Sequence, residues 1–476
     1  MNPALRVGTA LKDAAIDYKN GLVNLGHCPR EIWIAYAVKV LESLAYFSSV
    51  LVLMIFLTQD MGLTDTMAGT IFGLWSASMS FFMLFVGFIA DSLGIKKALI
   101  VGLFIALVGR LAITFTTNPW FVYPGLFVLS VGFAYMIPLI AAAVKLFSTK
   151  KAQSYAFSWY YVVMNVGSFI AGISLDGLRA TFTEPIAFGF LGMDLVIRPI
   201  QIIFAVAVVA TFVSLALVIF FVRTRIPPEE LASDEDDEES RQKAVAQDKA
   251  QQESQHKTAL DVMKEVVKER TFWIFITFIF LLVLVKMIFQ YNHSLYPLYM
   301  ERIGFSEWTG KLYSINPLII IFLVPVMTAM TRHMKAYNVI MLGSFVSAGS
   351  VFFMGVGESI MMIVMFQVVL SIGEALYSPR IYDYTANVAP PGKESSYMAY
   401  SKAPMFFAKV AAGPITGILL ANMCAEGSIA AERNTELMWI IVGISTMVSP
   451  IMLLLGRRWL DVETRKQRGE LKELQK

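Results

Sequence analysis

Charged residues are scarce in this sequence. Asp, Glu, Lys and Arg together make up 16% of the 476 residues, whereas 57% of the residues are hydrophobic. Soluble domains usually carry about 25% charged residues. A soluble fold cannot bury so large an apolar fraction, so the composition excludes an ordinary soluble protein and indicates an integral membrane protein.

Residue types that often carry chemistry are also few. The chain has two cysteines and four histidines, and it contains no metal-binding cluster, nucleotide-binding loop or nucleophile motif. We therefore expect no metal, no cofactor and no enzymatic activity. A formal net charge of +3 gives no reason to expect a nucleic-acid partner. Cys28 and Cys424 are predicted on opposite sides of the membrane, so no disulfide is expected.

Long apolar segments recur along most of the chain. Each is close to the ~20 residues that an α-helix needs to cross a ~30 Å hydrocarbon core. A helix satisfies its backbone groups within the segment, and the alternating segments of a membrane β-barrel are absent. The sequence therefore predicts an all-α membrane protein with twelve transmembrane helices, at residues 32–57, 67–90, 98–115, 120–147, 152–173, 200–222, 272–300, 308–331, 339–356, 360–388, 397–423 and 438–455.

The distribution of Lys and Arg predicts the orientation of these helices. Basic residues cluster in every second connection and at both ends of the chain, and the connections at 58–66, 116–119 and 357–359 contain none. Because basic loops stay in the cytoplasm, we expect a multi-pass protein of a bacterial-type inner membrane with both termini cytoplasmic. The N-terminal stretch mixes both signs of charge and has no apolar core, so no cleavable signal peptide is expected.

One segment in the middle of the chain has a different composition. The acidic run DEDDEE occupies residues 234–239 and is followed by Lys, Gln and Ala. We interpret residues 224–270 as a cytoplasmic linker between a six-helix bundle at 1–223 and a second bundle, with a cytoplasmic tail, at 271–476. Within the linker, Thr258 and Asp261 resemble a capping box, which predicts a short helix at the membrane surface.

A loop motif connects this organisation with a known family. The stretch GFIADSLGIKK at 87–97 resembles the GxLADxxGRK loop of the major facilitator superfamily. That resemblance implies two six-helix bundles that rock around a site near the middle of the membrane. Asp91 lies in the motif, and we expect it to act in gating by accepting hydrogen bonds from a neighbouring helix end.

Several ionisable residues fall inside predicted membrane helices. Such residues cost about 2.5–3.5 kcal/mol each and usually line a cavity. Lys39 and Glu42 share a face of the first helix at i, i+3, so they either neutralise each other or act in proton coupling. Lys286 in the seventh helix and Glu374 in the tenth are predicted at the same depth as Glu42, facing a central cavity.

Other polar positions in the helices divide into binding and structural candidates. The amides of Asn165, Gln290 and Asn316 are deep in their helices, where an unpaired amide is costly, and they are predicted cavity residues. Arg380 and Asp383 are expected to form a gate or a structural pair near the cytoplasmic end of the tenth helix. Arg110 and Lys409 are assigned structural roles, and His293 is predicted to be a hydrated histidine near the outer end of its helix.

Three further stretches resemble the proton-coupled oligopeptide transporter family. SWYYVVMNVGSFIAG at 158–172 is similar to its FYxxINxGS signature, with Tyr161 and Asn165 at matching positions. LYSINPLIIIFLVP at 312–325 resembles its SINPxxxxxxxP helix, and GEALYSP at 373–379 resembles its GExxxSP segment. The resemblance implies that Tyr46, Tyr161 and Glu374 are substrate-binding residues, with Glu374 meeting a substrate amino group.

The first helix departs from the family pattern. Where the family has ExxERFxYYG, this chain reads KVLESLAYFSS, which places Lys39 at the first Glu and Ser43 at the Arg while keeping Glu42. The usual Lys of the fourth helix is Ile137, and the usual acid of the seventh is Phe289. Cations thought to meet a peptide carboxylate are therefore missing, and Lys39 and Lys286 are the candidate replacements.

These observations predict a proton-coupled symporter that imports a small polar or zwitterionic, peptide-like solute by alternating access. Glu42 is the leading proton site, with Lys39 as its partner. The expected partners are the solute, protons and the lipid bilayer, and the expected state is a monomer. Two alternatives stay open: a proton-coupled antiporter that exports amphipathic compounds, and a membrane sensor that binds solute without transporting it.

Overall fold

The structure is a computed structural model. It describes most of the chain, namely residues 23–93, 95–149, 152–190, 193–223, 268–331, 333–388, 403–462 and 465. The acidic run at 234–239 and the capping-box segment around Thr258 lie outside the described residues, so the predicted linker and its surface helix stay predictions.

The described chain is almost entirely helical, and the predicted all-α membrane fold is confirmed. Eleven helical spans are long and apolar enough to cross a membrane, and α3 (Asp65–Leu93) packs among them as a further long helix of 29 residues. The other helices of the first part are α2 (Arg30–Ile55), which continues through the π-turn η1 (Phe56–Asp60), α4 (Ile95–Thr114), α5 (Pro119–Leu146), α6 (Gln153–Thr181) and α7 (Pro199–Phe221).

Two of the predicted helices in the second part are interrupted. The seventh is divided at Leu282 into α10 (Arg270–Leu281) and α11 (Val283–Arg302), and the eighth at Ser314 into α12 (Thr309–Tyr313) and α13 (Ile315–Thr331), preceded by the turn η3 (Ser306–Trp308). The remaining elements are α14 (Ala336–Met354), α15 (Ile360–Val388), α17 (Ala403–Met423), η4 (Ala430–Glu432), α18 (Thr435–Leu455) and α19 (Arg457–Leu460).

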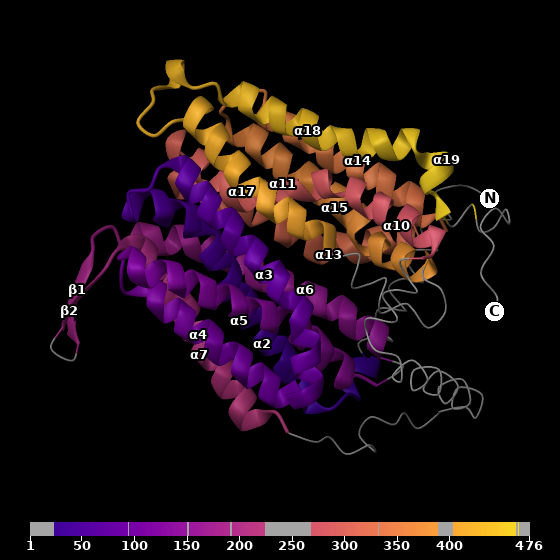
Figure 1. The fold of residues 1–476 in the computed structure, drawn as a ribbon, viewed down its shortest axis with the longest axis horizontal. Helices are drawn as coiled ribbons and strands as arrows, with labels where there is room; N and C mark the ends of the chain where they lie inside the picture. The colour runs from indigo at the N-terminus through magenta and orange to yellow at the C-terminus, as the bar shows by residue number, and fades with distance from the viewer. Residues whose placement is uncertain are drawn as a thin grey trace.

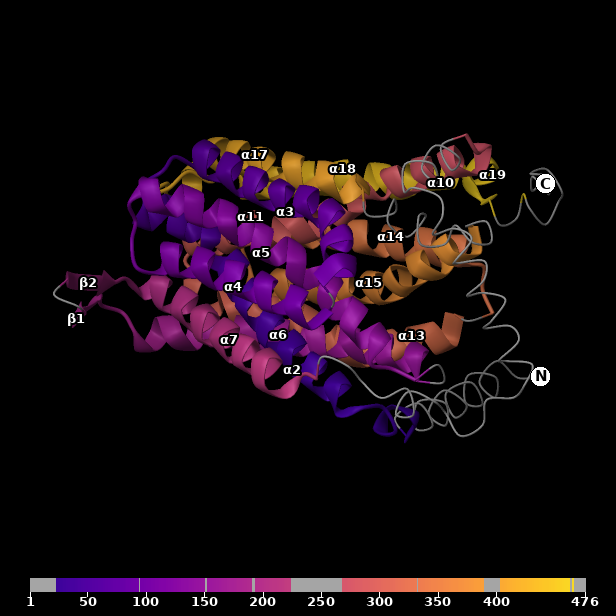
Figure 2. The ribbon, with the colours of Figure 1, turned by 60° about the horizontal axis from the view of Figure 1, so that its bottom comes forward.

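A β-hairpin between α6 and α7 was not predicted. Strand β1 (Ile186–Phe190) pairs antiparallel with β2 (Met193–Ile197), with Ile186 opposite Ile197. The hairpin projects from one end of the helices, and α19 lies at the opposite end (Figures 1 and 2). We call these the hairpin end and the α19 end.

The helices form two groups that meet along a seam. In the first helix group α2, α3, α4, α5, α6 and α7 pack on one another, and in the second α10, α11, α13, α14, α15, α17 and α18 do so. Across the seam α3 packs on α17, α6 on α12 and α13, and α2 on α11 (Figure 1). The second helix of each group thus meets the fifth of the other, as expected for two related bundles.

Glycines bring the helices close together at two of these crossings. A Cβ on Gly73 of α3 would lie 2.9 Å from Pro414 Cδ on α17, and a Cβ on Gly172 of α6 would lie 2.7 Å from the carbonyl oxygen of Gly310 on α12. Only glycine, which has no Cβ, leaves room for these close approaches.

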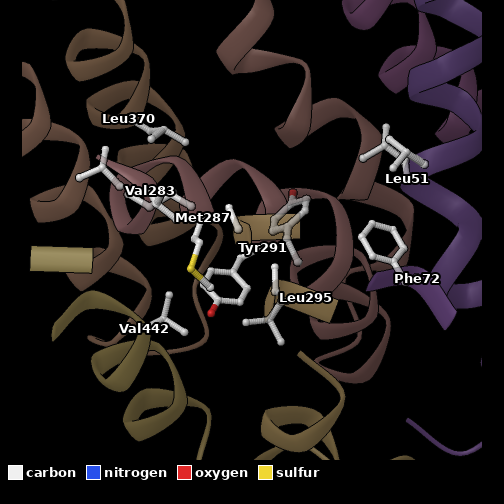
Figure 3. Packing of buried hydrophobic residues seen from close by; sticks show 14 of the residues in the cluster. Leu51, Phe72, Val283, Met287, Tyr291, Leu295, Leu370 and Val442 are labelled. Atoms are coloured by element: carbon white, nitrogen blue, oxygen red, sulfur yellow. The ribbon is translucent and has the colours of Figure 1, made fainter. Parts of the chain in front are cut away.

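The apolar core extends across the seam. Figure 3 shows Leu51 and Phe72 of the first helix group facing the α11 side chains Tyr291 and Leu295. The same cluster continues through Met287 and into α15 and α18. Apolar side chains of the two groups are therefore in contact across the seam.

Candidate functional site

Glu374 lies in the middle of α15 at the centre of a polar cluster. One carboxylate oxygen accepts a 2.9 Å hydrogen bond from the Tyr161 hydroxyl of α6, and the other accepts a 3.0 Å bond from the Asn316 amide of α13. The Asn316 amide also donates to Ser371 Oγ at 3.1 Å. Three residues that the sequence predicted for substrate binding, on three helices of both groups, therefore meet at one point.

The charge of this cluster is not balanced within the described part of the chain. The groups that act on the Glu374 carboxylate are the neutral amide of Asn316 and the neutral hydroxyl of Tyr161. All three residues are largely, but not completely, buried. A buried carboxylate held only by neutral donors is suited to receive a cation.

Lys39 and Glu42 form an ion pair on α2. The ammonium lies 2.8 Å from the carboxylate, and each side chain is only 4% exposed. The ammonium also lies 5.1 Å from the ring centroid of Tyr160, a cation–π contact. The hydroxyl of Ser43, at the position where the peptide-transporter motif has an arginine, is buried without a hydrogen-bond partner.

The remaining predicted binding residues surround these two centres less directly. Tyr46 packs edge-on against Phe133, with ring centroids 5.0 Å apart. Asn165 is buried and donates its amide to the Tyr161 carbonyl at 2.9 Å, which fixes it to its own helix. Gln290 is buried on α11, and Lys286 is half-buried one turn before it.

The predicted gating residues are only partly described. Arg380 donates from Nη2 to Thr331 Oγ1 at 3.1 Å and to the Thr328 carbonyl at 3.4 Å, which ties the α19-side half of α15 to α13. Asp91 lies on α3 and Asp383 on α15, but the positions of their side chains are outside the described part of the structure. Their roles in gating stay predictions.

Arg110 of α4 is almost completely buried. It donates from Nη1 to the Ala207 carbonyl of α7 at 3.0 Å and to the Thr211 hydroxyl, and its guanidinium lies 4.9 Å from the ring centroid of Phe133. These contacts fit the structural role expected from the sequence. The field of Arg110 also reaches Glu42, so a second cation acts near the Lys39–Glu42 pair.

The prediction for His293 was wrong. The imidazole is not at a hydrated outer surface but lies half-buried on the seam, with Nε2 3.1 Å from the Tyr313 hydroxyl and its ring centroid 5.8 Å from that of Phe47. The sequence correctly placed His293 in the seventh membrane helix. In so apolar a helix, however, the sequence periodicity does not determine which face meets the other helix group.

Sequence reasoning also missed a set of polar contacts that closes the seam at the hairpin end. Arg302 of α11 forms two hydrogen bonds with the Asp65 carboxylate of α3, at 2.9 and 2.5 Å. Arg179 of α6 pairs with Glu301 in the same two-bond manner. Asp176 of α6 accepts the backbone N–H groups of residues 310 and 311 at 2.8 and 2.7 Å. We call these three contacts the hairpin-end lock.

Cys424 adjoins this lock. Its carbonyl accepts a hydrogen bond from Arg302, and its side chain has no exposed surface. Burial raises the pKa of the Cys424 thiol to about 11, despite the nearby guanidinium groups of Arg302 and Arg433. Cys28, before α2, is the other cysteine, and both thiols are free and buried.

A family model described as Major Facilitator Superfamily matches residues 37–414. Among curated relatives, dipeptide and tripeptide permease A of Pectobacterium carotovorum subsp. carotovorum (strain PC1) is 22% identical over 181 residues, which cover 37% of this chain and 36% of the relative. The same permease of Proteus mirabilis (strain HI4320) is 24% identical over 166 residues, or 34% of each chain. The matches thus span only about a third of these relatives' length.

Solved structures resemble this fold over nearly its whole length. A POT family transporter in complex with a thioalcohol-conjugated peptide superimposes with a TM-score of 0.71 at 16% identity, over 91% of this chain and 97% of that one. A POT family transporter in complex with 5-aminolevulinic acid gives a TM-score of 0.70 at 16% identity with the same coverage. At this identity the likeness concerns the fold.

Proposed function

Because the chain belongs to the major facilitator superfamily, we propose that it is a proton-coupled symporter that imports a small zwitterionic, peptide-like solute by alternating access. The observation that carries this proposal is the Glu374 cluster. It joins the two helix groups through Tyr161 and presents a carboxylate without a cationic partner among the described residues. An ammonium group supplied by a solute would complete the cluster and act on both groups at once.

The acid end of a zwitterion needs a cation nearby. Lys39 is engaged with Glu42 at 2.8 Å, so it is available to a solute only when that pair is loosened. Protonation of Glu42 removes the negative charge that holds the ammonium. We therefore assign Glu42 as the proton site and Lys39 as the group that links the proton to the solute, with Lys286 as a second candidate for the acid end.

In the proposed cycle, the seam between the two helix groups opens at one end while it closes at the other. With the hairpin-end lock formed, the two groups are joined at that end by two paired arginines and by Asp176. A transport cycle requires this lock to open and the α19 end to close in turn. One proton moved through a potential of about 100 mV supplies about 2.3 kcal/mol for accumulation.

We place the chain in a bacterial inner membrane as a monomer, with the α19 end in the cytoplasm. A cysteine introduced at position 236 of the proposed cytoplasmic linker should then resist a membrane-impermeant reagent applied to intact cells. Labelling from outside would contradict this orientation.

Uptake by the purified, full-length chain in proteoliposomes tests the function. Dialanine and 5-aminolevulinate, the second because a structural neighbour was solved in complex with it, are offered under an inward proton gradient. A symporter accumulates at least one such zwitterion, and a protonophore abolishes the accumulation. Binding without flux would indicate a sensor, and movement of solute against the proton gradient would indicate an exporter.

A further inference from the structure

His293 occupies a position where the two helix groups touch. Its Nε2 lies 3.1 Å from the hydroxyl of Tyr313 on α12, and that hydroxyl lies 3.2 Å from Ser168 Oγ on α6. The imidazole also packs on Phe47 of α2, with ring centroids 5.8 Å apart. His293 thus contacts the first helix group directly through Phe47 and indirectly through Tyr313.

The charged group that acts on the imidazole is a cation. Lys409 of α17 belongs to the same helix group as His293, and its field reaches the imidazole. The Lys409 ammonium lies 3.9 Å from Met79 Sδ on α3, so it too faces the first helix group. The two side chains therefore place two ionisable groups of the second helix group against the first.

The electrostatic neighbours of the Tyr313 hydroxyl differ from those of the imidazole, because they are a carboxyl group and a phenol rather than a cation. Glu374 of α15 and Tyr46 of α2 both influence it electrostatically. In the described part of the chain, no carboxylate is hydrogen-bonded to the imidazole itself, whose polar contact is Tyr313. An imidazolium here would have no direct counter-charge.

We propose that His293 is a second proton-binding residue of the transport cycle, and that its protonation opens the seam at the hairpin end. A neutral imidazole exchanges a hydrogen bond with Tyr313 and fits the closed seam. An imidazolium would be a second buried cation near Lys409, which is costly without a partner. Water that enters the open seam solvates the charge and removes that cost.

Linkage gives the sign and size of the effect. The open seam binds the proton and the closed seam does not, so acid shifts the equilibrium toward the open form. A hydrated histidine titrates near pH 6.5. Between pH 7.5 and pH 5.5 the ratio of open to closed molecules should therefore rise about tenfold.

Spin labels across the seam measure this ratio. Gln59 of the first helix group and Glu426 of the second both line a pocket of about 250 Å³ at the hairpin end. Labels at Gln59→Cys and Glu426→Cys, in full-length protein with Cys28→Ser and Cys424→Ser, report the distance by double electron–electron resonance in nanodiscs. Acid should convert the short distance of the closed seam into a longer one, about tenfold in population ratio.

His293→Gln is the informative variant, because glutamine can still hydrogen-bond to Tyr313 but cannot be protonated. Its distance at pH 7.5 should equal that of the parent, which also shows that it folds, and the ratio should change less than about twofold on acidification. His333→Gln, between α13 and α14, is the matched control and should keep the tenfold change. An unchanged response in His293→Gln, or closure in acid, would overturn the proposal.

Lys409→Met gives a second, independent measurement. Without the neighbouring cation, an imidazolium is less unfavourable in the closed seam, so the acid-induced opening should be smaller than in the parent. An opening as large as the parent's would contradict the electrostatic explanation.

This inference rests on the proposed function only in taking the proton as the coupled ion. The label measurement needs neither solute nor flux, so the two can fail separately. Proton-driven uptake with no pH response at the seam would remove the role of His293 alone. A pH response without uptake would remove the symporter and leave a pH-sensitive seam.

Discussion

The Tyr161 hydroxyl and the Glu374 carboxylate belong to different helix groups, and the hydroxyl donates a 2.9 Å hydrogen bond to the carboxylate across the seam. A ligand that neutralises Glu374 therefore acts at a junction of the two groups. Binding and rearrangement are linked at this point, because any change in the carboxylate's charge changes the strength of the contact.

Glu374→Gln should weaken the binding of zwitterionic solutes. Removing one member of a buried, hydrogen-bonded charge pair costs about 2–5 kcal/mol, so Kd should rise at least about 30-fold. Tyr161→Phe keeps the charge and should raise Kd less than about tenfold. Isothermal titration of the purified variants measures both. The variant Glu374→Gln could instead bind a zwitterion and its N-acetylated analogue with similar affinity, and bind each as tightly as the parent does. That result would exclude Glu374 as the ammonium site.

Glu42→Gln should abolish proton-driven accumulation and spare counterflow. Exchange of bound solute requires no net movement of protons, whereas accumulation does. The measurement is uptake of labelled solute in proteoliposomes with and without a proton gradient.

The variant leaves Lys39 buried without its counter-charge, which can lower stability. The double variant Lys39→Gln with Glu42→Gln removes both charges and serves as the folded control, checked by its Tm. A Glu42→Gln protein that still concentrates solute would reduce Glu42 to a structural partner of Lys39.

Asp65→Asn should open the hairpin-end lock and expose Cys424. The bidentate pair with Arg302 loses its charge, and a loss of about 1.4 kcal/mol raises the open population about tenfold. The rate of maleimide modification of Cys424, in a Cys28→Ser background, should rise accordingly. All variants are compared at one neutral pH, because the raised pKa of this thiol keeps it protonated there.

Glu31→Gln is the matched control for that experiment. Glu31 pairs with Arg223 at the opposite end, and both residues belong to the first helix group. Its loss should leave the modification rate of Cys424 within about twofold of the parent, a difference below about 0.5 kcal/mol. Equal acceleration in both variants would show that general loosening, not the seam, exposes the thiol.

Two buried arginines should respond oppositely to replacement by methionine. Arg110 has no carboxylate within ion-pair distance among the described residues. The Ala207 carbonyl, which accepts a hydrogen bond from Arg110, also accepts one from the Thr211 hydroxyl at 2.7 Å. Arg110→Met therefore leaves no orphaned group and should keep or raise Tm. Arg302→Met leaves Asp65 without its partner and should lower Tm. Thermal unfolding followed by tryptophan fluorescence decides between these outcomes.

The helices could be predicted from the sequence because apolar length alone determines them. The predicted segment at 360–388 coincides with α15, and most other boundaries differ by a few residues. The interruptions at Leu282 and Ser314 and the hairpin at 186–197 were missed. Local apolar content gives no signal for the first two, and the hairpin is too short to stand out beside long helices.

The centre of the candidate site was predictable and its surroundings were not. Asn316 and Glu374 were identified because deep polar residues are costly unless they meet, whereas Tyr161 was identified from the resemblance of its helix to a family signature. The structure brings the three together. The contacts of His293 and the hairpin-end lock depend on how helices rotate toward the seam. Asp65 and Arg302 are 237 residues apart, so no local pattern could pair them.

The glycine crossings bear on the speed of the proposed transport cycle rather than on the affinity for solute. At Gly73 against Pro414, and at Gly172 against Gly310, a helix surface that lacks a side chain lies directly against the neighbouring helix. Helices in such contact can roll over one another without any change of rotamer. An alanine at Gly73 would insert a methyl group into the contact and slow interconversion in both directions, so kcat should fall while the equilibrium affinity for solute stays near that of the parent. The two crossings would then set the turnover rate of the whole cycle.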